Sequence, residues 1–469
     1  MGGEKEMLKT WKEKFIGDRA FYKMVLLIAV PIMIQNGITN FVNLLDNIMV
    51  GQIGTEQMSG VAIVNQLIFV YNLCIFGGLS GAGIFTAQYF GQKDEEGIRN
   101  TFRFKIWMAV LITIIAIIIF VMGGSNLISL YLNDGSTGDL AATLEYGKLY
   151  LMIMLTGLPG FMLVQIYSST LRECGETVVP MKAGIAAVLT NLIGNYLLIY
   201  GKFGFPELGV AGAAIATSLS RYVEAAIVVG WTHFNKEKNP YVVGLYRTLM
   251  LPSSLVKAII VKGTPLLLNE TFWSMGMAAL TQCYSVRGLH VVAAFNISST
   301  IGNLFNVSFI AMGSAVAIIM GQMLGAGKLK EARDTNNKLI MFTILLCIGV
   351  ALCMVLFAPF FPKLYNTEEE TRKLATGLIM LQSLFMPQQG FLNAAYFTLR
   401  SGGKTIITFF FDSVFICLVS VPLAYVLSRF TTLPILLIFA LVQMGDWIKC
   451  VIGFILIKNG SWIQNIIDK

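Results

Sequence analysis

The sequence predicts an all-α protein with about twelve membrane-spanning helices, from its composition and from the length of its apolar runs. Of its 469 residues, 56% are hydrophobic and only 13% are charged, with a mean hydropathy of +0.71. A soluble domain carries nearer a quarter charged residues. Apolar runs of roughly 20 residues recur to the end of the chain, and each is long enough to cross a bilayer core. The composition therefore excludes a soluble globule.

The apolar runs are separated by short polar segments, of which residues 232–255 form the longest. Residues 1–23 are charged and place Leu8, Trp11 and Phe15 on one helical face, so we expect an interfacial helix there. The expected spans are roughly 24–50, 58–86, 104–124, 143–170, 179–200, 208–231, 256–284, 289–320, 338–358, 374–398, 405–428 and 433–457.

Three pairs of similar segments indicate that the two halves of the chain are repeats. Six spans return the chain to its starting side, so the copies share one orientation and a pseudo-two-fold axis along the membrane normal. We expect two six-helix lobes, at 1–231 and 256–469, joined by a cytoplasmic linker at 232–255. The pairs are "TLRECGETVVP" (170–180) with "TLRSGGKTIIT" (398–408), "AQYFGQKDEEGIRNT" (87–101) with "GQMLGAGKLKEARDT" (321–335), and "AVPIMIQN" (29–36) with "GTPLLLNE" (263–270).

Basic residues predict the orientation in the membrane. Lysines and arginines gather in the N-terminal segment, in 93–103, in 232–255 and in 328–333, all on one side of the expected topology. The positive-inside rule makes that side cytoplasmic, so both termini are expected inside a plasma (inner) membrane. The net charge of +8 is explained by these loops, and we expect membrane lipid and no nucleic acid as a partner.

The sequence contains no motif typical of an enzyme or of a bound cofactor. Its seven cysteines form no CxxC pair, and His233 and His290 are far apart, so neither a metal site nor a disulfide framework is predicted. We find no nucleotide-binding P-loop, catalytic triad or haem motif. We therefore expect a protein that is no enzyme, has no cofactor and depends on an ion gradient for any transport that it performs.

Of the acidic residues inside expected spans, Asp46 and Glu270 are the candidates for function, because charge there is rare and usually faces a cavity or a partner. Asp46 lies in "FVNLLDNIMVG" (41–51), and it could alternatively be a membrane-edge residue in contact with water. Glu270 lies in "GTPLLLNETFWSMGMAALTQ", aligned with Asn36 of the other repeat. It could alternatively be a neutral, hydrogen-bonded glutamic acid, a state that could still exchange protons.

Two further spans carry polar residues that could serve packing or ligation, and alone these residues decide nothing. Asn191 and Asn195 are one helical turn apart in "LTNLIGNYLLIYG", and Thr217 lies among small residues in "GVAGAAIATSLS". Amides and hydroxyls there could join helices or supply oxygen ligands to a hard cation.

Other features inside the spans receive a structural interpretation. Pro31, Pro265, Pro387 and Pro422 each interrupt a span and should bend it, either statically or as part of a movement. Asp412 could lie at the interface, Arg221 could pair with Glu224, and Asp446 could pair with Lys449.

Several of these motifs resemble the multidrug and toxic compound extrusion (MATE) transporters over nearly the whole chain. They are "PIMIQNGITNFVNLLDNIMVGQIG", the paired "TLR-x-x-G-x-T" motifs and "LGVAGAAIAT". The resemblance implies two six-helix lobes facing each other in a V. It also implies secondary active export of organic cations or lipophilic drugs by alternating access, in exchange for inward Na⁺ or H⁺.

The resemblance also implies site residues. Asp46, Asn191 and Thr217, with the carbonyl of Ala213, match the family's N-lobe cation site and could hold Na⁺. Asn195 replaces the second acid that the DinF-like branch carries. In the C-lobe, Glu270 matches a glutamate of the NorM-like branch, and Gln389 replaces that branch's second acid. The sequence therefore matches neither coupling site fully.

Two alternatives to ion-coupled drug export remain. One is a lipid-linked sugar flippase of the same superfamily as the MATE transporters, and the other is a channel or a receptor. A lipid-linked sugar flippase tends to carry extra helices or a strongly cationic cavity, and no cluster of intramembrane arginines is visible. A channel or a receptor has no general need for paired lobes with acids near the midplane. We expect the protein to act as a monomer.

Overall fold

The computed structural model describes residues 14–132, 139–365 and 367–467. Within these ranges it is all-α, with twelve long helical stretches, which confirms the predicted fold class. Ten of the twelve are long and apolar enough to cross a membrane, and the other two are α8 and α11. Leu8 and Trp11 of the expected interfacial helix lie outside the described residues.

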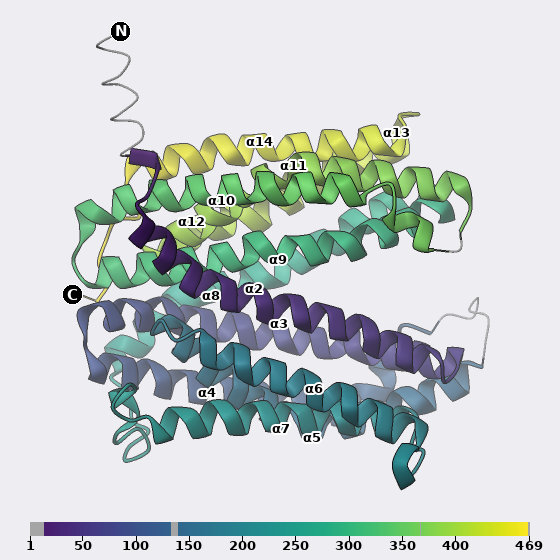
Figure 1. Ribbon diagram of the computed structural model, residues 1–469, viewed down its shortest axis with the longest axis horizontal. Helices are drawn as coiled ribbons and strands as arrows, with labels where there is room; N and C mark the ends of the chain where they lie inside the picture. Colours follow the sequence, from purple (N-terminus) through teal and green to yellow (C-terminus); the bar gives the residue numbers. More distant parts are fainter. Residues whose placement is uncertain (1–13, 133–138, 366, 468–469) are drawn as a thin grey trace. The chain divides into compact units, whose positions relative to one another are not determined.

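The helices carry the labels of Figure 1. The twelve stretches are α2 (Arg19–Gly51), α3 (Thr55–Gln92), α4 (Glu95–Ser129), α5 (Leu140–Glu173), α6 (Val178–Tyr200), α7 (Val210–Phe234), α8 (Ser253–Ser285), α9 (Leu289–Gly325), α10 (Leu329–Phe357), α11 (Glu369–Ser401), Thr405–Phe430 and α14 (Ile435–Asn459). Short 3₁₀ turns are η1 (Lys202–Gly204), η2 (Pro240–Val242) and η3 (Phe361–Leu364).

Several helices extend beyond the predicted apolar runs. The third expected span, 104–124, lies inside α4, which begins at Glu95. Glu95 and Glu96 occupy the first turn of α4, where negative charge is favourable near the free N–H groups of a helix. A helix can therefore continue past the bilayer core into polar surroundings, and hydropathy alone does not locate its start.

By its contacts the chain divides into two compact units. The first contains the residues up to Met33, Ala87–Asp94 and Ile260–Lys469, and the second contains Ile34–Thr86 and Glu95–Ile259. This division differs from the expected lobes, and the expected linker at 232–255 falls within the second unit. The lobes with their symmetry axis stay a prediction.

The start of α2 belongs to the first unit because its apolar face packs there. Val25 and Ile32 are buried in a core that includes Met312 of α9. The end of α3 joins the same unit through Gln88, whose Nε2 donates to the carbonyl of Ser401 at 3.0 Å. Within this unit α11 packs against α9, α10 and α14.

In the second unit, α7 packs against both α5 and α6. The contact faces are made of small residues, which let the helices approach closely. An added Cβ at Gly194 of α6 would lie 2.9 Å from the Cβ of Ala216 on α7, and one at Gly157 of α5 would lie 2.8 Å from the Oγ of Ser218. The small residues around Thr217 therefore serve helix packing.

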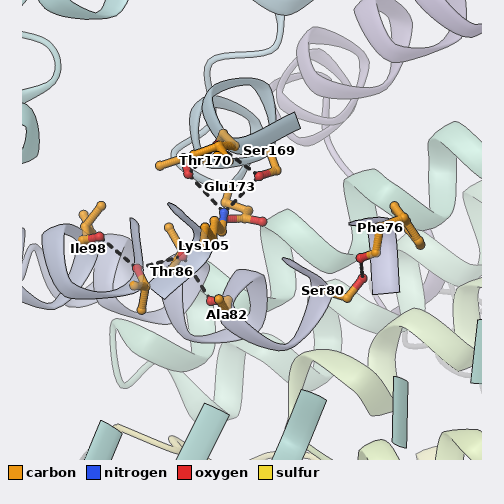
Figure 2. A network of polar contacts seen from close by, with 11 residues as sticks. Phe76, Ser80, Ala82, Thr86, Ile98, Lys105, Ser169, Thr170 and Glu173 are labelled. Carbon is orange, nitrogen blue, oxygen red and sulfur yellow. Dashed lines mark hydrogen bonds and ion pairs between the residues drawn. The ribbon is translucent and has the colours of Figure 1, made fainter. Parts of the chain in front are cut away.

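A buried ion pair joins α4 to the end of α5 (Figure 2). The side chain of Lys105 is 0% exposed and that of Glu173 is 18% exposed. The ammonium of Lys105 donates to Ser169 Oγ at 3.1 Å, Thr170 Oγ1 at 3.0 Å and Glu173 Oε2 at 2.5 Å. An added Cβ at Gly83 of α3 would collide with Glu173, so three helices meet at this carboxylate.

Arginines of α4 donate hydrogen bonds to the segment that connects α7 to α8. Arg103 donates from Nε to the carbonyl of Leu245 at 2.9 Å and from Nη2 to that of Gly244 at 3.0 Å. Arg99 donates to the carbonyl of Tyr241 at 3.2 Å. Burial raises the pKa of Tyr241 far above its usual range, so its hydroxyl stays protonated and donates within the segment.

Prolines interrupt several of the long helices. Pro31, Pro265 and Pro387 lie inside α2, α8 and α11, as the sequence predicts, and Pro159 lies inside α5 as well. The Thr405–Phe430 stretch is α12 (Thr405–Phe409), two π-helical turns, η4 (Phe410–Val414) and η5 (Ile416–Ser420), and α13 (Val421–Phe430). Pro422 follows these widened turns, which accommodate its missing N–H.

Candidate functional site

A small cavity in the second unit contains Asp46, which lies near the end of α2. The volume of the cavity is about 60 Å³, and its walls come from α2, α6 and α7. The lining residues are Thr39, Val42, Asn43, Asp46, Gly184, Ala187, Val188, Asn191, Thr217, Ser220, Arg221 and Glu224.

The carboxylate of Asp46 is bound by a neutral amide from α6. Asn195 Nδ2 donates to Asp46 Oδ1 at 2.6 Å, and Asn195 itself is 1% exposed. Among the described residues, Asn195 Oδ1 has no hydrogen-bond partner although it is buried. An unsatisfied buried oxygen is costly, so a cation or a proton donor at this position would be favourable.

Asn191 connects Asp46 to Thr217. Its amide fits best with the nitrogen facing Asp46, because Nδ2 then donates to Oδ1 at 2.9 Å and to Oδ2 at 2.8 Å. The oxygen then accepts from Thr217 Oγ1 at 3.0 Å. The structure thus brings together Asp46, Asn191, Asn195 and Thr217, four of the five residues expected at one site.

Ala213, the fifth, lies one turn before Thr217 on α7 and is 3% exposed. The cavity wall formed by the described residues does not include it. A role for its carbonyl in binding an ion stays a prediction.

The sequence predicts only a structural role for two residues of this cavity. Arg221 and Glu224 pair as expected, with Nη1 3.2 Å from Oε2, but both also line the cavity that contains Asp46. The signal that could have identified them is their spacing from Thr217, since residues four and seven positions further along share one face of a helix.

Glu270 and Gln389 lie in the first unit, and Asn36 lies in the second. Glu270 is half-buried on α8, and Gln389 is half-buried on α11. Gln389 Nε2 donates to Gln443 Oε1 and to Asp446 Oδ2, both at 3.3 Å. Glu270 lies on α8 and Gln389 lies on α11. These are the two long helices that are not among the ten apolar enough to cross a membrane.

Lys449 forms its ion pair with Asp412, in place of the expected partner Asp446 on its own helix. Lys449 Nζ lies 3.3 Å from Asp412 Oδ1. The ammonium also lies 5.7 Å from the ring centres of Phe411 and Phe415, which favours this side of α14. The side chain of Asp412 is 24% exposed, so it is packed against other helices and is no simple interfacial residue.

The Asp46 site has the chemistry of a site for a hard monovalent cation or for a proton. A carboxylate, an unsatisfied amide oxygen and a hydroxyl are the oxygen ligands that such ions prefer. Within the described ranges, no group of three or more His, Cys, Asp or Glu residues could hold a metal ion. The carboxylate of Asp46, held by the amides of Asn191 and Asn195, therefore defines the candidate site.

Comparison with known proteins agrees with the fold. The family model described as MatE matches residues 31–197 and 265–426. The "Probable multidrug resistance protein NorM" of Thermotoga maritima is 25% identical over 440 residues, which cover 92% of this chain and 89% of that protein. The "Probable multidrug resistance protein YoeA" of Bacillus subtilis is 24% identical over 422 residues, which cover 88% and 89%.

Solved structures share the same architecture. One described as an outward-facing multidrug resistance MATE family transporter of the MOP superfamily superposes with a TM-score of 0.84 at 20% identity, covering 95% of this chain and 97% of that chain. A MOP superfamily transporter from Pyrococcus furiosus gives a TM-score of 0.83 at 21% identity, with the same coverage. These likenesses confirm the all-α polytopic fold.

Proposed function

Because the chain belongs to the MatE family, we propose that it is a secondary active multidrug efflux transporter. It exports organic cations or lipophilic drugs in exchange for an inward monovalent cation, by alternating access. It acts in the plasma membrane with both termini in the cytoplasm, as the basic loops predict.

The observation that supports ion coupling is the environment of Asp46. Its carboxylate lies in a cavity lined by Asn191 and Thr217 and accepts a hydrogen bond from Asn195, whose Oδ1 is buried without a partner among the described residues. Moving one monovalent cation out of a negative interior costs about 2.3 kcal/mol per 100 mV. Bringing one Na⁺ or H⁺ inward cancels that term and leaves the ion's concentration gradient to drive export.

The amide of Asn195 beside Asp46, in the place of a second acid, favours Na⁺ over H⁺ as the coupling ion. A hard cation is bound by several converging oxygens, whereas a stored proton is favoured by a second carboxylate close to the first. Asn195 supplies an amide where a second acid would stand, 2.6 Å from Asp46. H⁺ competes for the same carboxylate.

Efflux from whole cells tests the function. Cells that lack their own pumps are loaded with ethidium, and the loss of fluorescence is followed with and without the protein. We expect faster efflux with the protein, and we expect that collapsing the Na⁺ and H⁺ gradients with ionophores abolishes the difference. Efflux equal to that of the empty vector would contradict the proposed function.

A further inference from the structure

The end of α3 makes a close crossing with the end of α9 inside the first unit. An added Cβ at Gly91 would collide with the carbonyl oxygen of Gln322, and one at Gly325 would collide with that of Gln88. The contacts are reciprocal, because the repeated segments 87–101 and 321–335 align Gln88 with Gln322 and Gly91 with Gly325. Glycine permits such an approach of one backbone to another, and any side chain at either glycine would force the two helices apart.

Gln88 connects this crossing to α11 and to the segment that follows α14. The residue is 0% exposed, and both ends of its amide are bonded. Nε2 donates to the carbonyl of Ser401, the last residue of α11, at 3.0 Å, and Oε1 accepts from the backbone N–H of Ile466 at 2.9 Å. The last carbonyls of a helix have no partner within it, so Gln88 caps α11 and holds Ile466 at the same time.

The segment 461–467 is itself fixed to the ends of α11 and α14. Trp462 is 0% exposed, and its Nε1 donates to the carbonyl of Ile457 at 3.2 Å. An added Cβ at Gly402 would collide with the carbonyl oxygen of Trp462, and Gln464 Nε2 donates to the carbonyl of Gly402 at 2.5 Å. The segment is therefore anchored on the first unit and reaches α3 through Gln88.

α3 belongs to both units of the chain. Its residues 55–86 are part of the second unit, and its residues 87–92 are part of the first. Alternating access requires parts of a transporter to move against each other, so either α3 bends or its end leaves the first unit.

We propose that Gln88 is the latch of this crossing: it holds the end of α3 on α9 and α11 through the segment 461–467, and the latch opens once in each transport cycle. This inference rests on the proposed function and deepens it. Gln88 is a positioning residue, since it acts on the helix ends and on no transported ion or drug.

The reactivity of a buried thiol measures how often the latch opens. Ala87→Cys, at a position 4% exposed, is introduced in a background without native cysteines, and modification of the purified full chain by N-ethylmaleimide is followed. Gln88→Leu removes both hydrogen bonds, and Ile466→Pro removes the N–H that Oε1 accepts. Losing a buried hydrogen bond favours the open state on the order of tenfold, so we expect modification about tenfold faster in each variant.

Two comparisons distinguish the latch from general loosening. Ile466→Ala loses the side chain but keeps the N–H, so its rate should rise far less than that of Ile466→Pro. Adding Ile466→Pro to Gln88→Leu should give no further increase, because both changes remove the same bond. Wild-type rates in Gln88→Leu and Ile466→Pro, equal rates in Ile466→Ala and Ile466→Pro, or effects that multiply in the double variant would overturn the latch.

A cross-link tests whether the latch opens during transport. An added Cβ at Gly321 would lie 2.7 Å from the Cβ of Ala87. This is about 1 Å closer than in a disulfide, so Ala87→Cys with Gly321→Cys can tie α3 to α9 after a small shift. The control pair is Ala395→Cys with Gly453→Cys, whose Cβ atoms would lie 3.5 Å apart and which ties α11 to α14.

Both pairs are compared in proteoliposomes with a Na⁺ or H⁺ gradient. We expect oxidation of the first pair to stop ethidium uptake and reduction to restore it, while oxidation of the control pair has no effect. Uptake by the fully cross-linked first pair would show that α3 bends instead, and would overturn the opening of the latch. A wild type that takes up no ethidium would overturn the proposed function and the transport role of the latch, whereas the thiol rates would still decide whether Gln88 holds α3.

Discussion

Asn195 Nδ2 lies 2.6 Å from Asp46 Oδ1, so the group next to the carboxylate of α2 is a neutral amide from α6. The amide orients the carboxylate without adding charge. Its other atom, Oδ1, is buried without a partner among the described residues. The chemistry of the site therefore depends on what the Asp46 carboxylate, held by neutral amides, can bind.

Replacing Asn195 by aspartate should shift coupling towards H⁺. Two carboxylates at hydrogen-bond distance share one proton, so Asn195→Asp stores a proton where the wild type presents an amide. We expect the ratio of H⁺-driven to Na⁺-driven ethidium uptake into proteoliposomes to rise on the order of tenfold. A ratio equal to that of the wild type would show that Asn195 does not govern the choice of ion.

The Lys105–Glu173 ion pair should contribute to stability when both charges are present. Lys105→Met leaves the Glu173 carboxylate without its ammonium, and breaking a buried pair in this way costs about 3–5 kcal/mol. The double variant Lys105→Met with Glu173→Gln should recover most of the loss, since it leaves no uncompensated charge. Thermal unfolding of the purified protein measures both.

An exposed pair provides the control for this prediction. Lys373 and Glu369 lie 3.2 Å apart with side chains 77% and 79% exposed, and Lys373→Met should leave thermal unfolding almost unchanged. A double variant as unstable as Lys105→Met would contradict the account of the buried pair.

Glu270 should assist coupling or cation binding in the first unit. Glu270→Gln keeps the shape of the side chain and removes its charge, so we expect slower dye export across roughly pH 6 to 8, the range that a buried carboxyl can reach. Glu370→Gln, at an exposed position of α11, is the control. If Glu270→Gln exports dye at the wild-type rate over that pH range, Glu270 has only a structural role.

The loop after α7 should face the cytoplasm. Glu237 is exposed, whereas Asn239 in the same loop is buried, so a cysteine is introduced at Glu237 in a background without native cysteines. We expect no labelling by an impermeant maleimide in intact cells and strong labelling after lysis. Thr55→Cys, at an exposed position on the opposite side of the expected topology, should label before lysis. The reverse pattern would invert the orientation.

The helices could be predicted from the sequence because burial in lipid requires long apolar runs. Asp46, Asn191, Asn195 and Thr217 could also be grouped, because the resemblance to MATE transporters places them at one cation site. The partner of Lys449 could not be predicted, because Asp446 on its own helix and Asp412 on another stretch fit the sequence equally well. In the structure the ammonium lies beside the rings of Phe411 and Phe415, while Asp446 accepts from Gln389 instead.

The contribution of Arg221 to the Asp46 cavity also required the structure. Its spacing to Glu224 predicts a pair on α7, and that pair is present. Whether a pair on a helix faces lipid, a neighbouring helix or a cavity depends on how the helix is rotated in the bundle. Helical spacing alone does not supply that rotation.

Transport by Asp46→Asn in proteoliposomes tests whether Asp46 holds the coupling ion. A Na⁺ gradient is imposed at constant pH, then a pH gradient without Na⁺, and ethidium uptake is followed each time. Asp334→Asn, at an exposed position on α10, is the control. We predict that the Na⁺ gradient drives uptake by the wild type and by the control, and that Asp46→Asn couples to neither gradient while remaining folded. If only the pH gradient drives the wild type, the preference for Na⁺ is wrong and the role of Asp46 stands. Coupling by Asp46→Asn at the wild-type level, with either ion, would contradict the account.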